Sequence, residues 1–355
     1  MATRVPPSQR KTFHQRDHGL YERPIVSLDF HAEHSSLFGT SVLILLIAAI
    51  GGLVIGFGLS LWSERLSVTE RRLLHKQPVS TRARRGRSVV VMFVTAALFA
   101  GLVVAVDQFG VMETPEVRPS ANGRLLRLAY HLALISLLIV ATAIDFDSYV
   151  IPDQITLPGM LLGLGGAFAV GELQLCHLWV DWSVAMPHLR GPHIPAWFDA
   201  HRHWHGLAWS TAGLMVGATI TWLARAISSR VLGQEAMGLG DVTLMAMIGS
   251  FVGWQAVVLV FLLAPIAGLT VGVMIKLVSG KSYLPYGPWL SMAAVFVLFR
   301  WGWLWQHTRL VFSDWLGLSI LAAVGVGGFV LLLGLVLMYR AIPVRRTNSG
   351  SQARE

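Results

Sequence analysis

Two aspartates stand where an apolar chain is least expected to carry charge. Asp145 closes the apolar run 125–144, and Asp241 opens another run directly behind Gly238-Leu239-Gly240. A carboxylate at bilayer depth costs roughly 2.5–3.5 kcal/mol on insertion scales, so acids in such places are candidates for a functional site. Two carboxylates that share one proton act as general base and general acid on water. The pair suggests peptide hydrolysis without a metal or other cofactor.

Each acid also has a simpler explanation when it is taken alone. Asp241 at the start of a helix can cap that helix and interact favourably with its dipole. Asp145, Asp147 and Asp153 lie in a segment where Pro152 and Pro158 break helices and favour an extended chain, which is also typical of solvated acids in a turn between two spans. The hydrolytic reading requires Asp145 and Asp241 to meet across the fold, and the sequence alone does not establish that meeting.

The composition is that of a polytopic membrane protein. Of the 355 residues, 54% are hydrophobic and 13% are charged, which is too apolar for an ordinary soluble domain. A spanning helix needs about 20 apolar residues, and we expect an all-α bundle of eight or nine transmembrane helices. One long run is divided at Gly253-Trp254, because a straight helix of that length would overshoot the bilayer. The expected spans are 39–62, 88–106, 125–144, 155–171, 206–224, 242–257, 259–278, 286–305 and 317–338.

The charge distribution predicts how the chain is oriented. The net charge of +9 is concentrated in short loops beside the spans, where basic residues orient a membrane protein, so we expect no nucleic-acid binding. The densest basic loop, 63–87, is assigned to the cytoplasm by the positive-inside rule. Counting spans from that loop places Asp145 and Asp241 on the same cytoplasmic face. The expected location is the cell inner membrane, with the active site facing the cytoplasm.

The expected organisation places a peptidase core between two variable ends. Its parts are a polar tail (1–38), the first span (39–62), the basic loop (63–87), the core (88–305) with an extracytoplasmic loop (172–205), an extra helix (306–338) and a basic cytoplasmic tail (339–355). In the extracytoplasmic loop His201, His203 and His205 alternate, which is conceivable for metal binding but is more typical of an interfacial aromatic cap. The single cysteine, Cys176, excludes an internal disulfide and a cysteine-rich zinc site.

Four motifs, in order along the chain, resemble those of the type IV prepilin leader peptidases. The resemblance covers roughly residues 88–305. The motifs are Asp145 with Pro152-Asp153-Gln-Ile-Thr156-Leu-Pro158, then Met237-Gly238-Leu239-Gly240-Asp241, then Gly253-Trp254-Gln255, and finally Gly280-Lys281 followed by Pro285-Tyr286-Gly287-Pro288.

This resemblance implies a membrane-embedded aspartyl endopeptidase that binds type IV prepilins or pseudopilins. Such an enzyme cuts a short basic leader on the cytoplasmic side, just after a glycine. The catalytic pair falls on Asp145 and Asp241. The supporting motif residues are Gly238, Gly240, Pro152, Asp153, Asp147, Pro285, Gly287 and Pro288.

The chain departs from the family pattern at three places. Most bacterial members carry paired Cys-x-x-Cys motifs in the first cytoplasmic loop, which are linked to N-methylation of the product, and 63–87 contains no cysteine. We therefore expect no N-methyltransferase activity. Thr243 stands where the family commonly has lysine, and the span at 317–338 lies beyond the usual eight.

Three other functions are consistent with acids at the ends of apolar segments. A presenilin-type intramembrane protease shares Gly-x-Gly-Asp, but it normally has Tyr-Asp in the earlier helix, whereas Ile144 precedes Asp145 here. A proton-coupled transporter would use acids near mid-membrane and inverted repeats. A non-catalytic assembly factor would keep the fold without the activity.

Cysteine labelling tests the expected topology. In a Cys176→Ala background, we expect single cysteines at Ser148 and Gln234 to react with membrane-impermeant thiol reagents only after the cell is opened. A cysteine at His193 should react in intact cells once the outer layer is permeabilised. Labelling of position 148 from outside would invert the topology and separate the aspartates from the cytoplasm.

Overall fold

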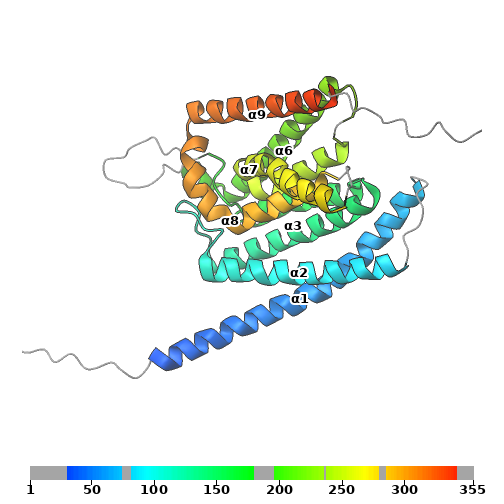
Figure 1. Ribbon diagram of the computed structural model, residues 1–355. Helices are drawn as coiled ribbons and strands as arrows, with labels where there is room; N and C mark the ends of the chain where they lie inside the picture. Colours follow the sequence, from blue (N-terminus) through cyan, green and yellow to red (C-terminus); the bar gives the residue numbers. More distant parts are fainter. Residues whose placement is uncertain (1–29, 74–80, 180–195, 236, 280–284, 342–355) are drawn as a thin grey trace, which may run out of the picture. The chain divides into compact units, whose positions relative to one another are not determined.

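The computed structural model describes residues 30–73, 81–179, 196–235, 237–279 and 285–341, and these residues form helices and connecting loops with no strand among them. The expected all-α class is therefore confirmed (Figure 1). The helices are α1 (Phe30–Leu73), α2 (Thr81–Phe109), α3 (Ala121–Ser148), α4 (Asp153–Val170), α5 (Ala196–Ala200), α6 (Arg202–Leu232), α7 (Leu239–Ser279), α8 (Gly287–Ser313) and α9 (Trp315–Ala341). Residues 45–355 form the unit described below.

The described helices make the chain a multi-pass membrane protein. Five segments are long and apolar enough to cross a bilayer: Leu43–Leu73, Arg84–Phe109, Ala121–Ser148, Arg202–Leu232 and Leu239–Gly268. A sixth arises if α8 and Trp315–Leu331, which meet at a bend of 108°, form one broken span. The expected eight or nine spans exceed this number. The expected division of the long run is confirmed, since α7 joins two helical parts across a kink at Gly253, while α4, which contains Asp153 and Pro158, is not among the five.

Helix ends differ from the expected boundaries because charged residues continue several helices past their apolar runs. Most of the expected loop 63–87 is helical, since α1 reaches Leu73 and α2 begins at Thr81. Arginine and glutamate are good helix formers, so hydropathy marks the apolar part of a helix and not its ends. The expected loop 172–205 likewise contains α5 and the start of α6, and residues 306–313 belong to α8. The expected tail, 1–38, lies outside the described residues up to position 29.

Gly253 bends α7 at the place where the sequence analysis divided the run. Its φ of 81° and ψ of 171° are not helical, and a positive φ favours glycine because it has no Cβ. A Cβ at this position would overlap the indole of the buried Trp209 on α6. Beyond the kink, the Trp254 indole N–H donates to the Leu178 carbonyl at 2.7 Å and ties α7 to the loop after α4.

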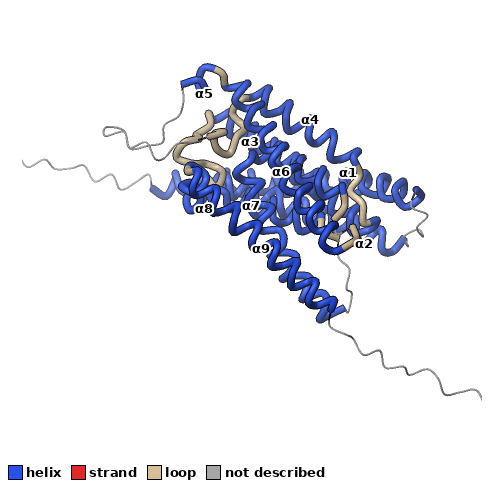
Figure 2. Tube along the Cα trace, turned by 90° about the horizontal axis from the view of Figure 1, so that it is seen from above, coloured by secondary structure: helices blue, strands red, loops and turns tan. Residues whose placement is uncertain are grey.

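Helices α6 and α7 pack backbone against backbone through matching glycines. Each helix carries Gly-x-x-x-Gly, as Gly213 with Gly217 and as Gly249 with Gly253. A Cβ at Gly213 would overlap the Gly249 carbonyl, and the reverse also holds. Small residues at this spacing let membrane helices approach closely and gain van der Waals contact. This glycine seam, formed by Gly213, Gly217, Gly249 and Gly253, holds α7, the helix that carries Asp241, against α6. The described loops lie at the ends of the helices (tan in Figure 2).

We expect Gly213→Ala to destabilise the protein by about 1–3 kcal/mol, because the added methyl group has to displace backbone. The matched control is Gly165→Ala on α4, where an added Cβ meets nothing within 4 Å and the unfolded chain loses entropy. Thermal unfolding in detergent, followed by circular dichroism, measures both. Equal melting temperatures for Gly213→Ala and the wild type would contradict the close packing.

The structure also changes which residue best reports topology. Ser148 is fully buried, and its hydroxyl donates to the Ile144 carbonyl at 2.9 Å, so a cysteine at position 148 is shielded from thiol reagents on both sides. Gln234 is exposed, so a cysteine at this position tests whether this part of the chain faces the cytoplasm. His193 lies outside the described residues.

Candidate active site

Asp145 lies in the last turn of α3 and is buried, with 5% of its surface exposed. The helix ends because Tyr149 adopts a left-handed conformation (φ 58°) and its N–H donates to the Asp145 carbonyl at 2.9 Å. The Asp145 carboxylate Oδ2 accepts the N–H of Gly287, at the start of α8, at 3.1 Å. A carboxylate at the end of one helix is thus held by the first backbone donor of another.

Asp241 lies in the first turn of α7 and is also buried, with 8% exposed. Its Oδ2 accepts the N–H of Gly238 at 3.2 Å, and a negative charge at a helix N-terminus is favoured by the helix dipole. Asp241 therefore interacts with the start of its own helix, as the simpler explanation in the sequence analysis expected. Asp241 directly follows Gly240, which packs against Ile151, six residues after Asp145, so the fold brings the two acids into one region.

Ile151, in the short link between α3 and α4, joins the two halves of this site. A Cβ added at Gly240 would lie 3.0 Å from the Ile151 Cβ, and one added at Gly287 would lie 2.8 Å from its Cδ1. The same Cβ at Gly287 would lie 2.6 Å from Asp145 Oδ2. Glycine at both positions thus lets the starts of α7 and α8 close around Ile151, with Asp145 against Gly287 and Asp241 next in sequence to Gly240.

Comparison with known proteins identifies the part of the chain around Asp241. Residues 193–273 match the model of the type IV leader peptidase family. This part of the chain is thus similar to the type IV leader peptidase family. The matched segment contains α6, the Gly238-Leu239-Gly240-Asp241 motif and most of α7.

Curated relatives extend the likeness to about half of the chain. A prepilin leader peptidase/N-methyltransferase of Pseudomonas putida is 30% identical over 168 residues, which are 46% of this chain and 47% of that protein. Proteins of the same name from Aeromonas salmonicida (28%; 48% of each chain) and Myxococcus xanthus (30%; 42% and 36%) are similar. The chain thus spans about half the length of the curated relatives it matches, or less. No solved structure shows a significant match.

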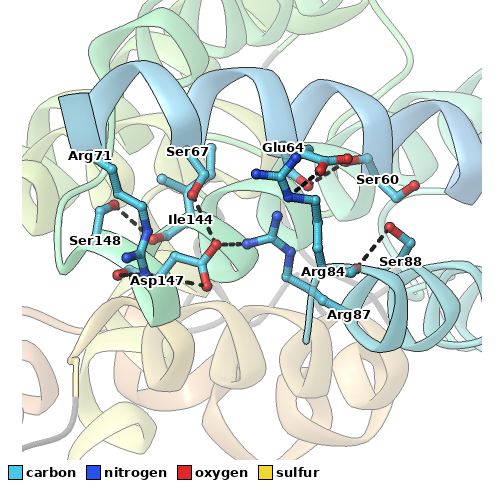
Figure 3. Close-up of polar contacts among 11 residues, drawn as sticks. Ser60, Glu64, Ser67, Arg71, Arg84, Arg87, Ser88, Ile144, Asp147 and Ser148 are labelled. Atoms are coloured by element: carbon cyan, nitrogen blue, oxygen red, sulfur yellow. Dashed lines mark hydrogen bonds and ion pairs between the residues drawn. The ribbon is translucent and has the colours of Figure 1, made fainter. Parts of the chain in front are cut away.

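Asp147, in the same turn of α3 as Asp145, makes different contacts. Its carboxylate forms an ion pair with Arg87 of α2 and accepts the Ser67 hydroxyl at 2.9 Å, while Arg71 donates to its carbonyl at 2.6 Å (Figure 3). The structure therefore places Asp147 in an arginine cluster with α1 and α2.

The other predicted residues shape the ends of helices. Pro152 is the N-cap of α4, and the exposed Asp153 lies in its first turn. Pro285 is buried just before α8, and Pro288 is buried in the first turn of that helix, where proline needs no donor.

The three alternating histidines, His201, His203 and His205, do not converge on one point. His203 contacts the Phe168 carbonyl at 2.7 Å, the buried His205 accepts the Leu178 N–H at 3.1 Å, and His201 is the N-cap of α6. Within the described residues, no group of three histidines, cysteines, aspartates or glutamates is arranged to hold a metal ion.

Two groups in the loop after α4 are structural. Glu172 accepts the Ser120 hydroxyl at 2.8 Å and pairs with Arg202 at 2.7 Å, and mainly the Ser120 hydrogen bond lowers the pKa of Glu172. Cys176 is fully buried, and burial raises the pKa of its thiol well above the usual value. A thiol in that state is a poor nucleophile, so it offers no cysteine-based alternative to the aspartates.

Sequence reasoning missed Ile151 and the contacts of Asp147. Ile151 stands inside the matched motif, directly before Pro152, but an apolar residue carries no chemical signal of its own. The partners of Asp147 come from helices that the sequence analysis treated as a separate span and loop. Only the density of arginines in 63–87 pointed to that region.

Proposed function

We propose that the chain is a membrane-embedded aspartyl endopeptidase that removes the basic leader from type IV prepilins or pseudopilins on the cytoplasmic side. The observation that carries the proposal is that Asp145 and Asp241 are both buried and each held by one backbone N–H, at helix ends that pack around Ile151. The match of residues 193–273 to the leader peptidase family supports it.

In the proposed mechanism, the two carboxylates act on one water molecule. The ionised carboxylate takes a proton from the water as it attacks the scissile carbonyl, and the protonated one hydrogen-bonds to the carbonyl oxygen. The proton is then delivered to the departing amine. The two acids titrate as a coupled pair, so the roles belong to the pair and not to either residue.

The positions of the acids favour this proposal over its rivals. Asp145 is in the last turn of α3 and Asp241 in the first turn of α7, whereas a proton relay in a transporter is expected near mid-membrane. The contact of Ile151 and Asp145 with Gly287 also gives the Pro-Tyr-Gly-Pro motif of the prepilin peptidases a role in the site. A presenilin-type protease is the remaining enzymatic alternative.

We expect Asp145→Asn and Asp241→Asn each to reduce leader cleavage by at least about 10²-fold, because an amide has nearly the same shape but does not exchange the proton. Conversion of a co-expressed prepilin on a gel measures the activity. Asp153→Asn is the comparison, since Asp153 is exposed on α4, and its effect on cleavage should be much milder. Wild-type cleavage by either dyad variant would refute the mechanism, and equal insertion of all variants into the membrane excludes misfolding.

We also propose that the product keeps an unmodified N-terminal amine. Only residues 74–80 separate α1 from α2, and a segment that short does not bury a core of its own for a methyl donor. We expect prepilin processed by this chain, in a host deleted for its own peptidase, to show no added methyl group by intact-mass analysis. The Pseudomonas putida relative, named as a peptidase and N-methyltransferase, is the positive control. A methyl group on the first residue would contradict the proposal.

A further inference from the structure

Side chains from α1 and α2 bind the last turn of α3 at Asp147 (Figure 3). These contacts are called the grip below. Arg87 of α2 forms an ion pair with Asp147 Oδ2, and the hydroxyl of Ser67 on α1 donates to the same oxygen at 2.9 Å. Arg71, one turn further along α1, donates to the Asp147 carbonyl at 2.6 Å and lies 3.9 Å from Oδ1. Two helices thus hold both the side chain and the backbone of one residue.

This grip is partly shielded from water. The side chains of Arg71, Arg87 and Asp147 are 20%, 19% and 16% exposed. Charged hydrogen bonds in such a setting are stronger than surface ion pairs, and removal of one partner leaves the other charge uncompensated. The contacts therefore fix the place of the α3 turn more firmly than an exposed ion pair would.

The gripped turn is the one that presents Asp145. Asp147 is two residues from Asp145, and Tyr149 closes the same turn by donating to the Asp145 carbonyl. Because this turn is short and regular, a movement of Asp147 moves Asp145 relative to the N–H of Gly287, which is 3.1 Å from its carboxylate. A displacement of about 1 Å in a catalytic group costs on the order of 10²-fold in rate.

We propose that Arg71, Arg87 and Asp147 are positioning residues, and that α1 and α2 act through them as a clamp that holds Asp145 against Gly287 and beside Asp241. The inference rests on the proposed function, because Asp145 is one of its two catalytic acids. The clamp residues take no part in the chemistry and act on the rate through the geometry of Asp145.

A neighbouring ion pair provides a matched control. Arg84 of α2 pairs with Glu64 of α1 at 2.7 Å and lies beside the clamp in Figure 3. Like Arg87 it connects α2 with another helix, but it joins α2 to α1 and not to α3. If the arginines only stabilised the packing of the helices, the loss of Arg84 and the loss of Arg87 would lower kcat to a similar extent.

The kinetic test uses the purified full chain and a prepilin substrate. We expect Asp147→Asn and Arg87→Gln to lower kcat by roughly 10- to 100-fold with little change in KM, because the acid is misplaced and the substrate contacts are not. Arg84→Gln should keep the wild-type kcat, and Arg87→Lys should recover part of the loss. Wild-type kcat in Asp147→Asn and Arg87→Gln, or an equal loss in Arg84→Gln, would overturn the clamp.

A second measurement does not depend on cleavage. Ser148 is buried in the gripped turn, so in a Cys176→Ala background a cysteine at position 148 reports whether the turn stays closed. We expect its reaction with a thiol reagent to speed up at least roughly tenfold when Arg87→Gln is added, and to be unchanged by Arg84→Gln.

Together the two measurements separate the two proposals. If Arg87→Gln exposes position 148 but the wild-type chain does not cleave prepilin, the proposed function fails, and with it the catalytic purpose of the clamp. If the wild type cleaves, and Arg87→Gln changes neither kcat nor the reactivity of position 148, the clamp fails and the proposed function stands.

Discussion

The burial of two carboxylates in an apolar bundle is the constraint on which the arrangement depends. An acid at this depth needs hydrogen-bond donors, but inside a helix the backbone N–H groups are already engaged, and free ones occur only in the first turn. The N–H of Gly287, at the start of α8, donates to the Asp145 carboxylate, and the N–H of Gly238, just before α7, donates to the Asp241 carboxylate. The end of α3 and the starts of α7 and α8 must therefore meet, and the glycines around Ile151 give them room to do so.

The rest of the fold provides a rigid frame for that meeting. The glycine seam between α6 and α7 fixes the helix of Asp241 from one side, while the arginine contacts of Asp147 fix the helix of Asp145 from the other. The kink at Gly253 lets α7 continue past the indole of Trp209. Each acid is thus anchored by a different type of interaction, one by close backbone packing and the other by charge.

The sequence predicted those features that depend on residue type at one position. Acids beside apolar runs marked Asp145 and Asp241, and the length of one run marked the bend at Gly253. Helix ends were missed because α1 and α2 continue through charged residues that hydropathy treats as loop. The partners of Asp147 and the place of Ile151 were missed because contacts between distant helices leave no local pattern. The division of α7 at Gly253 was predicted from length alone, but the packing of Gly253 against Trp209 of α6 was not visible in the sequence.

The hydrogen bond between Gly287 and Asp145 joins residues that are 142 positions apart, which bears on how the protein is made. A ribosome completes α3 long before α8 exists, so the newly inserted Asp145 has to wait, either protonated or in contact with water, for the donor that holds it. The two acids acquire their final surroundings only when the eighth helix docks. An unfinished chain that lacks α8 therefore holds both acids without the hydrogen bond that fixes Asp145 in the complete protein.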